Sequence, residues 1–202
     1  MTYGVCAAPG HDGTVLDLPG GGIDTGGVEA IETALIVPVP EVEDVVGVHR
    51  ARFDQAARWG VPAHVTVLYP FAPPDAVTED LLDAVRETVA GLPRFEIEFS
   101  EVRWFGEQVA WLAPTPDQPF RALTEALWAR FPDYPPYRGE FADVVPHLTI
   151  GHDVPVEGLS AAAEAVAARL PLRAEPREVR LMVGAPEPDA WRTAARFALG
   201  DA

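Results

Sequence analysis

A four-residue pattern, histidine-apolar-threonine-apolar, occurs twice in this chain, and the repetition constrains the fold more than any other feature. The first copy spans residues 64–67, within VPAHVTVLYPF, and the second spans residues 147–150, within VPHLTIGH. Apolar and β-branched residues bracketed by proline or glycine are typical of short strands. Side chains alternate between the faces of a strand, so the histidine and threonine of each copy share a face. The sequence therefore predicts two strands, each polar on one face and apolar on the other.

Helical periodicity on both sides of each copy indicates that the surrounding elements are duplicated as well. Apolar residues at helical spacing predict one helix before each copy and one after it, over residues 41–59, 78–91, 117–131 and 160–170. Thr78 is a suitable N-cap residue for the second of these helices. The shared order of helix, motif strand and helix predicts two similar lobes.

Further strands are expected between and after these helices. Apolar runs bounded by glycine or proline indicate strands over residues 33–40, 95–99, 102–106, 108–114, 177–185 and 190–199. The third and fourth of these flank Gly106 and Glu107, which predicts a hairpin.

The first thirty residues differ in composition from the rest of the chain. Residues 1–30 hold eight of the 17 glycines and show no sustained period, and no basic segment is followed by an apolar run there. This composition predicts a flexible tail and argues against a secretory signal. We expect residues 31–202 to form a single domain with two lobes.

Charge and composition exclude several classes of function. The chain of 202 residues is 48% hydrophobic, which suffices for a sizeable core, and it has no apolar run of the ~18 residues that a membrane span needs. With a net charge of -16, the chain lacks the positive field that binding of a long nucleic-acid duplex requires. Cys6 is the only cysteine, which excludes an internal disulfide and a cysteine-built metal site. A reducing cytoplasm fits this composition.

The two motif strands supply the groups that a phosphodiester site needs if they face one cleft. In-line displacement at phosphorus requires a base, an acid and hydrogen-bond donors for the nonbridging oxygens. A histidine with an ordinary pKa near 6.5 can be either acid or base, and threonine hydroxyls can donate to phosphate oxygens. The pattern therefore indicates chemistry at a phosphodiester.

At these residues the sequence resembles the two-histidine (2H) phosphoesterase superfamily, and most closely its 2′-5′ RNA ligase-like and cyclic phosphodiesterase branch. The resemblance covers about residues 32–199. It implies an α+β fold of two pseudo-symmetric lobes, with antiparallel sheets lining a central cleft and helices outside. It implies that His64 and His147 are the catalytic acid-base pair, that Thr66 and Thr149 bind the substrate phosphate, and that no metal or other cofactor takes part. By family analogy, His147 is the base and His64 the acid.

The resemblance also sets expectations for activity and partners. It implies a metal-independent phosphoesterase that acts on 2′,3′-cyclic phosphates or on 2′-5′ phosphodiester linkages. The substrate is then a small nucleotide or an RNA end, with no long duplex and no membrane as partner. The sequence leaves the oligomeric state open, with a monomer as the expectation.

Two other classes of function stay open. A nucleotide- or RNA-end-binding module without turnover could use the same fold, although intact histidines in both motifs argue against it. A metal hydrolase could use His147, His152 and Asp153, but zinc takes three or four converging ligands, and strand alternation separates the two histidines.

Several residues near the motifs receive a structural interpretation. Tyr69 and His152 each lie five positions after a motif histidine, so on a straight strand they point away from it. A bulge would turn them back, where they could flank a nucleobase. Arg138 is expected to be solvated. The core is expected to hold four tryptophans, Trp104, Trp111, Trp128 and Trp191.

Overall fold

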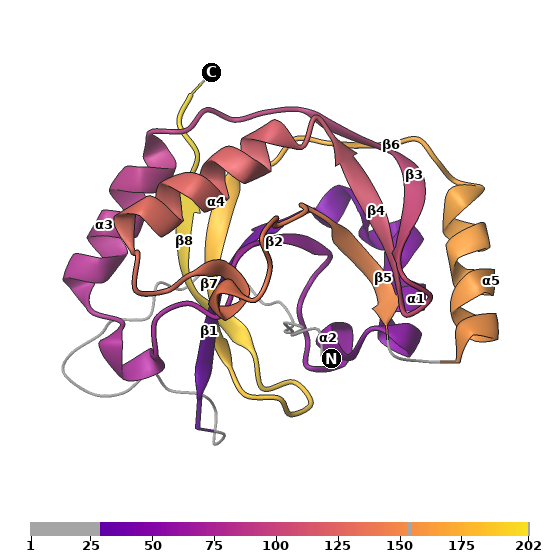
Figure 1. The fold of residues 1–202 in the computed structure, drawn as a ribbon, viewed down its shortest axis with the longest axis horizontal. Helices are drawn as coiled ribbons and strands as arrows, with labels where there is room; N and C mark the ends of the chain where they lie inside the picture. The colour runs from indigo at the N-terminus through magenta and orange to yellow at the C-terminus, as the bar shows by residue number, and fades with distance from the viewer. Residues whose placement is uncertain (1–28, 153–154, 202) are drawn as a thin grey trace.

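Two antiparallel sheets of four strands each form the centre of the molecule (Figure 1). The computed structural model describes residues 29–152 and 155–201, so nearly all of the predicted tail and Asp153 lie outside the described residues. The first sheet has the strand order β2-β1-β7-β8, and the second has the order β5-β4-β3-β6. The bounds in the first sheet are β1 (Glu32–Pro38), β2 (His64–Leu68), β7 (Glu178–Gly184) and β8 (Arg192–Ala198). Those in the second are β3 (Ile97–Phe105), β4 (Val109–Thr115), β5 (Leu148–His152) and β6 (Leu172–Ala174).

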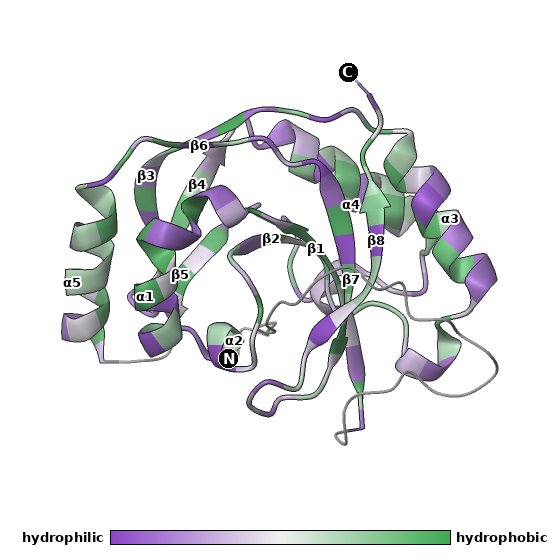
Figure 2. Cartoon of the chain, turned by 180° about the vertical axis from the view of Figure 1, so that it is seen from behind, coloured by the Kyte–Doolittle hydropathy of each residue, from purple (hydrophilic) through white to green (hydrophobic). Residues whose placement is uncertain are grey.

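The helices lie outside the two sheets, as expected. They are α1 (Glu43–Phe53), α2 (Gln55–Arg58), α3 (Glu79–Ala90), α4 (Gln118–Arg130) and α5 (Val156–Ala167), with short 3-10 helices η1 (Pro40–Val42), η2 (Pro74–Ala76) and η3 (Pro136–Gly139). Helices α3 and α4 pack against the first sheet, and α1 and α5 against the second. Figure 2 shows both hydrophilic and hydrophobic residues along α3 and α5, as expected for helices with one buried and one solvated face.

The prediction of one helix over residues 41–59 is wrong, because the helix is interrupted at Asp54. This residue has extended backbone angles, φ -115° and ψ 113°, and its side chain caps α2 by accepting a hydrogen bond from the Ala56 amide. The helix after the second motif also begins earlier than expected, at Val156. In contrast, Thr78 caps α3 through the Leu81 amide, as its sequence position predicts.

The two lobes are not contiguous halves of the chain. Strand β3 follows the first motif in sequence but pairs with β4, and β7 follows the second motif but pairs with β1. Counted from its motif strand, the third strand of each sheet thus comes from the repeat that contains the other motif. The edge strands β2 and β5, which carry the motifs, lie next to each other where the sheets meet.

The apolar face of each motif strand contributes to one continuous core. Val65, Val67, Leu148 and Ile150 are all almost fully buried, and they share a hydrophobic cluster with residues of α1, α3, α4 and α5. No helix within residues 29–152 and 155–201 is both long enough and apolar enough to cross a membrane.

Candidate active site

Both motif histidines lie at the start of their strands. His64 is the first residue of β2, and His147 immediately precedes β5. Thr66 and Thr149 are half-buried, whereas the apolar residues between and after the motif positions are buried. The alternation predicted from sequence is therefore present in both strands. The charge of His147 contributes to the pKa of His64, so the structure brings the two imidazoles within electrostatic reach of each other.

A bulge follows the threonine in each motif strand. In the first sheet Ile36 pairs with Thr66, but its neighbour Leu35 pairs with Leu68. The second sheet shows the same shift, because Trp111 pairs with residue 149 and its neighbour Ala110 pairs with residue 151. Each bulge inserts one extra residue and reverses the alternation that follows. Tyr69 consequently packs with Ile36 on the face of Thr66. The straight-strand expectation for residues 69 and 152 is wrong, and the alternative of a bulge is confirmed.

The two imidazole rings are oriented by the same backbone interaction. Nδ1 of His64 lies 2.9 Å from the carbonyl oxygen of Pro62, and Nδ1 of His147 lies 2.8 Å from that of Val145. A carbonyl oxygen can only accept a hydrogen bond, so Nδ1 carries the hydrogen in both rings. In the neutral form, Nε2 then holds the lone pair that can accept a proton.

Burial lowers the pKa of both histidines. It lowers the pKa of His64 to about 4, with help from the positive charge of Arg50 and against the opposing effects of the Pro62 carbonyl and Asp54. It also lowers the pKa of His147, against the Val145 carbonyl and Asp54. Both imidazoles are therefore neutral near pH 7 in the substrate-free protein.

A buried ion pair that was not predicted lies behind the histidines. Arg50 donates from Nε to Oδ2 of Asp54 at 2.9 Å and from Nη1 to the carbonyl oxygen of Val61 at 3.1 Å. Both side chains of the pair are almost completely inaccessible to solvent. Burial alone would raise the pKa of Asp54, but the Arg50 charge and the hydrogen bond with His152 hold it below its usual value. The only sign of this ion pair in the sequence is that Arg50 lies four residues before Asp54, where the helix is interrupted.

His152 belongs to this buried network. Its Nε2 lies 3.6 Å from Oδ1 of Asp54, and the residue is 6% exposed. The alternative metal site of His147, His152 and Asp153 is not supported by the structure, because Asp153 lies outside the described residues. In the described part of the chain, no group of three or more histidine, cysteine, aspartate and glutamate side chains is arranged to hold a metal ion.

Two aromatic rings contact His147. Trp111 stacks on Phe105 with 4.6 Å between ring centroids, and the His147 ring lies edge-on at 5.1 Å from Phe105 and 5.8 Å from Trp111. Trp111 is buried, as predicted, but its cluster with Val109 and Ala113 lies on the face of Thr149. The sequence did not distinguish this position from an ordinary core site.

The other three tryptophans that were expected in the core have different surroundings. Trp191 is buried and contacts Tyr69 at 6.5 Å between ring centroids, and Trp104 packs partly buried against the main core. Trp128 is 45% exposed, so the expectation of a core position is wrong for this residue. It lies in the last turn of α4, where one side faces solvent. Arg138 is exposed, as expected, and pairs with Glu32 at 3.7 Å.

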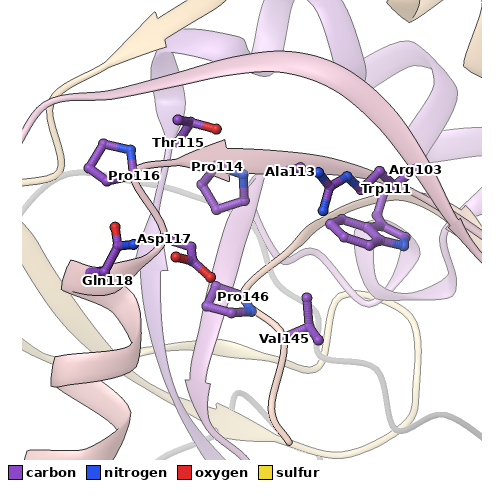
Figure 3. Close-up of a pocket in the computed structure, with 10 residues that line it drawn as sticks. All are labelled: Arg103, Trp111, Ala113, Pro114, Thr115, Pro116, Asp117, Gln118, Val145 and Pro146. Carbon is purple, nitrogen blue, oxygen red and sulfur yellow. The ribbon is translucent and has the colours of Figure 1, made fainter.

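A cavity of about 320 Å³ is lined in part by Val145 and Pro146, the two residues that precede His147 (Figure 3). Arg103, Trp111 and Ala113 line it from β3 and β4, and Val145 and Pro146 line it from the loop that leads into His147. Figure 3 shows the Arg103 side chain next to the Trp111 ring. The cavity therefore adjoins the second motif on the face that carries His147 and Thr149.

One arginine anchors the loop that precedes His147. Arg121 of α4 donates from Nη1 to Asp143 at 2.7 Å and to the carbonyl oxygen of Val144 at 3.2 Å, while its Nε contacts Asp117 at 2.7 Å. These contacts fix the loop from the side of α4. The contacted loop residues immediately precede Val145, whose carbonyl orients His147.

Comparison with known proteins assigns this arrangement to a family. The family model described as the 2′-5′ RNA ligase superfamily matches residues 37–186. A protein of Geobacillus kaustophilus (strain HTA426), whose name provisionally calls it a phosphoesterase, is 27% identical over 128 residues, which cover 60% of this chain and 68% of the relative.

Solved structures share the fold at low sequence identity. The protein TT0787 of Thermus thermophilus superposes with a TM-score of 0.58 and 16% identity, over 85% of this chain and 99% of that one. E. coli LigT complexed with 3′-AMP gives a TM-score of 0.52 and 17% identity, over 86% and 100% of the two chains. LigT has also been crystallised with ATP, where the TM-score is 0.51 at 20% identity, over 86% and 99% of the two chains. The expected two-lobed α+β fold is confirmed.

Proposed function

This chain belongs to the 2′-5′ RNA ligase superfamily, and on that premise we propose that it hydrolyses 2′,3′-cyclic phosphates or 2′-5′ phosphodiester linkages of nucleotides or RNA ends without a metal. Family and fold indicate a 2H phosphoesterase of the LigT-like type. One observation carries the finer proposal. Backbone carbonyls hold Nδ1 of both histidines, so each neutral ring keeps its proton-accepting atom at Nε2.

The different environments of the histidines suggest their roles. His64 has the pKa that is lowered to about 4, next to Arg50, and so holds a proton less readily. We therefore assign His64 as the base and His147 as the acid, the reverse of the family analogy. A bound phosphate raises the pKa of a neighbouring imidazole, which favours the protonated form of His147 in the complex.

The reaction then follows from these positions. Nε2 of His64 takes a proton from the attacking water as its oxygen bonds to phosphorus. Nε2 of His147 gives a proton to the departing ribose oxygen as that bond breaks, so a cyclic phosphate becomes a phosphomonoester next to a free hydroxyl. The hydroxyls of Thr66 and Thr149 donate to the nonbridging oxygens, which carry the developing charge.

A substrate panel with and without EDTA tests the proposed function. We expect turnover of at least one substrate among 2′,3′-cyclic nucleotides, RNA ends with a cyclic phosphate and 2′-5′-linked dinucleotides, at a rate that EDTA leaves unchanged. Activity that EDTA abolishes and one divalent ion restores would contradict metal independence. Binding of these compounds without any product would favour the alternative, a nucleotide-binding module.

Replacement of either motif threonine by valine should reduce activity less than loss of a histidine does. Thr66→Val or Thr149→Val keeps the side-chain shape but removes a hydroxyl that donates to a charged phosphate, a hydrogen bond worth about 1.5–3 kcal/mol. We expect kcat/KM to fall roughly 10- to 150-fold, with little change in melting temperature. Thr88→Val is a control, because that hydroxyl donates to the Ala84 carbonyl in α3. Equal losses in all three variants would contradict the assignment.

A further inference from the structure

A second three-residue pattern, Glu-Val-Arg, also occurs twice, once after each motif. It spans residues 101–103 in β3 and residues 178–180 in β7. These are the strands that each repeat contributes to the sheet of the other. The pattern is therefore part of the same duplication, and its position relative to the motifs can be read from the strand register.

The register places each arginine on the face of a motif threonine. In the second sheet Arg103 pairs with Trp111, which pairs with Thr149. Directly paired residues of antiparallel strands project from the same face. Arg103 thus lies two strands from Thr149, roughly 10 Å between backbones at the usual spacing, and its long side chain can shorten this distance.

The first sheet repeats the arrangement. Arg180 pairs with Ile36, and Ile36 pairs with Thr66. Arg180, from the second repeat, therefore lies on the same face as Thr66, from the first. In the other sheet, Arg103 from the first repeat lies on the same face as Thr149 from the second. Arg103 and Arg180 thus occupy equivalent positions in the strand register, each two strands from a motif threonine.

A carboxylate two residues earlier holds each guanidinium. Arg103 pairs with Glu101, and its Cζ lies 5.9 Å from the centroid of Trp111, at the cavity of Figure 3. Arg180 donates from Nε to Glu178 at 2.6 Å. A guanidinium has five N–H donors, so one carboxylate leaves donors for an anion.

We propose that Arg103 and Arg180 are specificity-determining residues that bind the outer phosphates of a substrate with a nucleotide on each side of the scissile phosphate. The proposal rests on the proposed function and deepens it, because it names the substrate class as 2′-5′-linked oligonucleotides with flanking phosphates. Arg103 binds the outer phosphate on the side of His147, and Arg180 binds the one on the side of His64.

Four matched substrates test this pairing. They are 2′-5′-linked diadenylates with a terminal phosphate at the 5′ end, at the 2′ end, at both ends or at neither. For the wild-type protein we expect each terminal phosphate to lower KM. Arg103→Gln should abolish the advantage in KM of one terminal phosphate and Arg180→Gln that of the other, each a change of about 10-fold. This is the low end for a hydrogen bond to a charged group, because the Arg103 side chain is 55% exposed.

The control variant is Arg86→Gln, which removes an exposed arginine paired with Asp83 on α3. It should not alter KM for any of the four compounds. Terminal phosphates without effect on the wild-type protein, or equal losses for all four compounds in both variants, would overturn the proposal.

Binding measured by calorimetry separates this proposal from the proposed function. Arginine-dependent binding of terminal phosphates without turnover would support the assignment of Arg103 and Arg180 while contradicting the proposed hydrolysis. Turnover at a rate that does not depend on the terminal phosphates would support the proposed hydrolysis and contradict the assignment of Arg103 and Arg180.

Discussion

Replacing His64 or His147 by alanine is expected to lower kcat by about 10²- to 10⁴-fold, the usual range for loss of a general acid or base. Each variant removes one Nε2 that transfers a proton, while the backbone carbonyl that oriented the ring remains. The double variant should lose far less than the product of the two single losses, because residues that act as a unit are not additive. The comparison is made with steady-state kinetics on the best substrate of the panel.

The pH dependence of kcat/KM assigns the two roles. His64 must be neutral as the base, so activity should rise with pH through its pKa of about 4. His147 must be protonated as the acid, so activity should fall as pH rises through a pKa that lies below the ordinary 6.5. The maximum is thus expected at acidic pH, because the pKa values of both histidines are lowered. His64→Ala should lose the acidic limb of the curve and His147→Ala the alkaline limb.

His49→Ala is the matched control, because this histidine lies in α1 outside the site. It should leave both kcat and the pH curve unchanged. Loss of the acidic limb in His147→Ala would reverse the two roles. Near wild-type turnover in both single variants would return both histidines to a structural role.

Replacing Arg50 by methionine should destabilise the protein by about 3–5 kcal/mol, because it leaves the Asp54 carboxylate buried without its counter-ion. The pair is inaccessible to solvent, so little water can reach the remaining charge. Urea unfolding at neutral pH measures the loss. Removing the arginine charge should also raise the pKa of His64, since Arg50 lowers it, and move the acidic limb of kcat/KM to higher pH.

Two comparisons isolate the buried charge as the cause. The double variant Arg50→Met/Asp54→Asn leaves no uncompensated carboxylate and should recover part of the lost stability. Arg86→Met breaks an exposed pair with Asp83, for which we expect a loss of no more than about 0.5 kcal/mol. A double variant no more stable than the single one would show that lost packing of the Arg50 side chain, and not the buried charge, causes the destabilisation.

The sequence predicted those features that depend on local pattern. The alternation around Thr66 and Thr149, the cap at Thr78 and the hairpin at Gly106 each follow from a few neighbouring residues, and the structure contains all of them. The helix break at Asp54 was missed because the apolar stripe continues past it to Ala56, although the side chain of Asp54 caps α2 locally; its contact with His152 comes from β5, far along the chain.

The rest of the site depends on pairing between distant strands. The bulges after both threonines arise from the register with β1 and β4, and nothing within the motifs specifies that register. Trp111 and Trp128 both have apolar neighbours in sequence, yet one contacts His147 and the other faces solvent. The place of each tryptophan is set by the sheet or helix face that its neighbours leave open.

The exchange of β3 and β7 between the sheets makes the monomer equivalent to a closed dimer of half-length chains. A polypeptide that ended after β3 would carry one of the two motif histidines, and the partner of its last strand would be β4, which it lacks. It could complete its sheet only by exchanging that strand with a second copy, as in domain swapping. Such a two-fold dimer would present two identical motif strands to each other, so a symmetric assembly of single repeats would already hold both imidazoles.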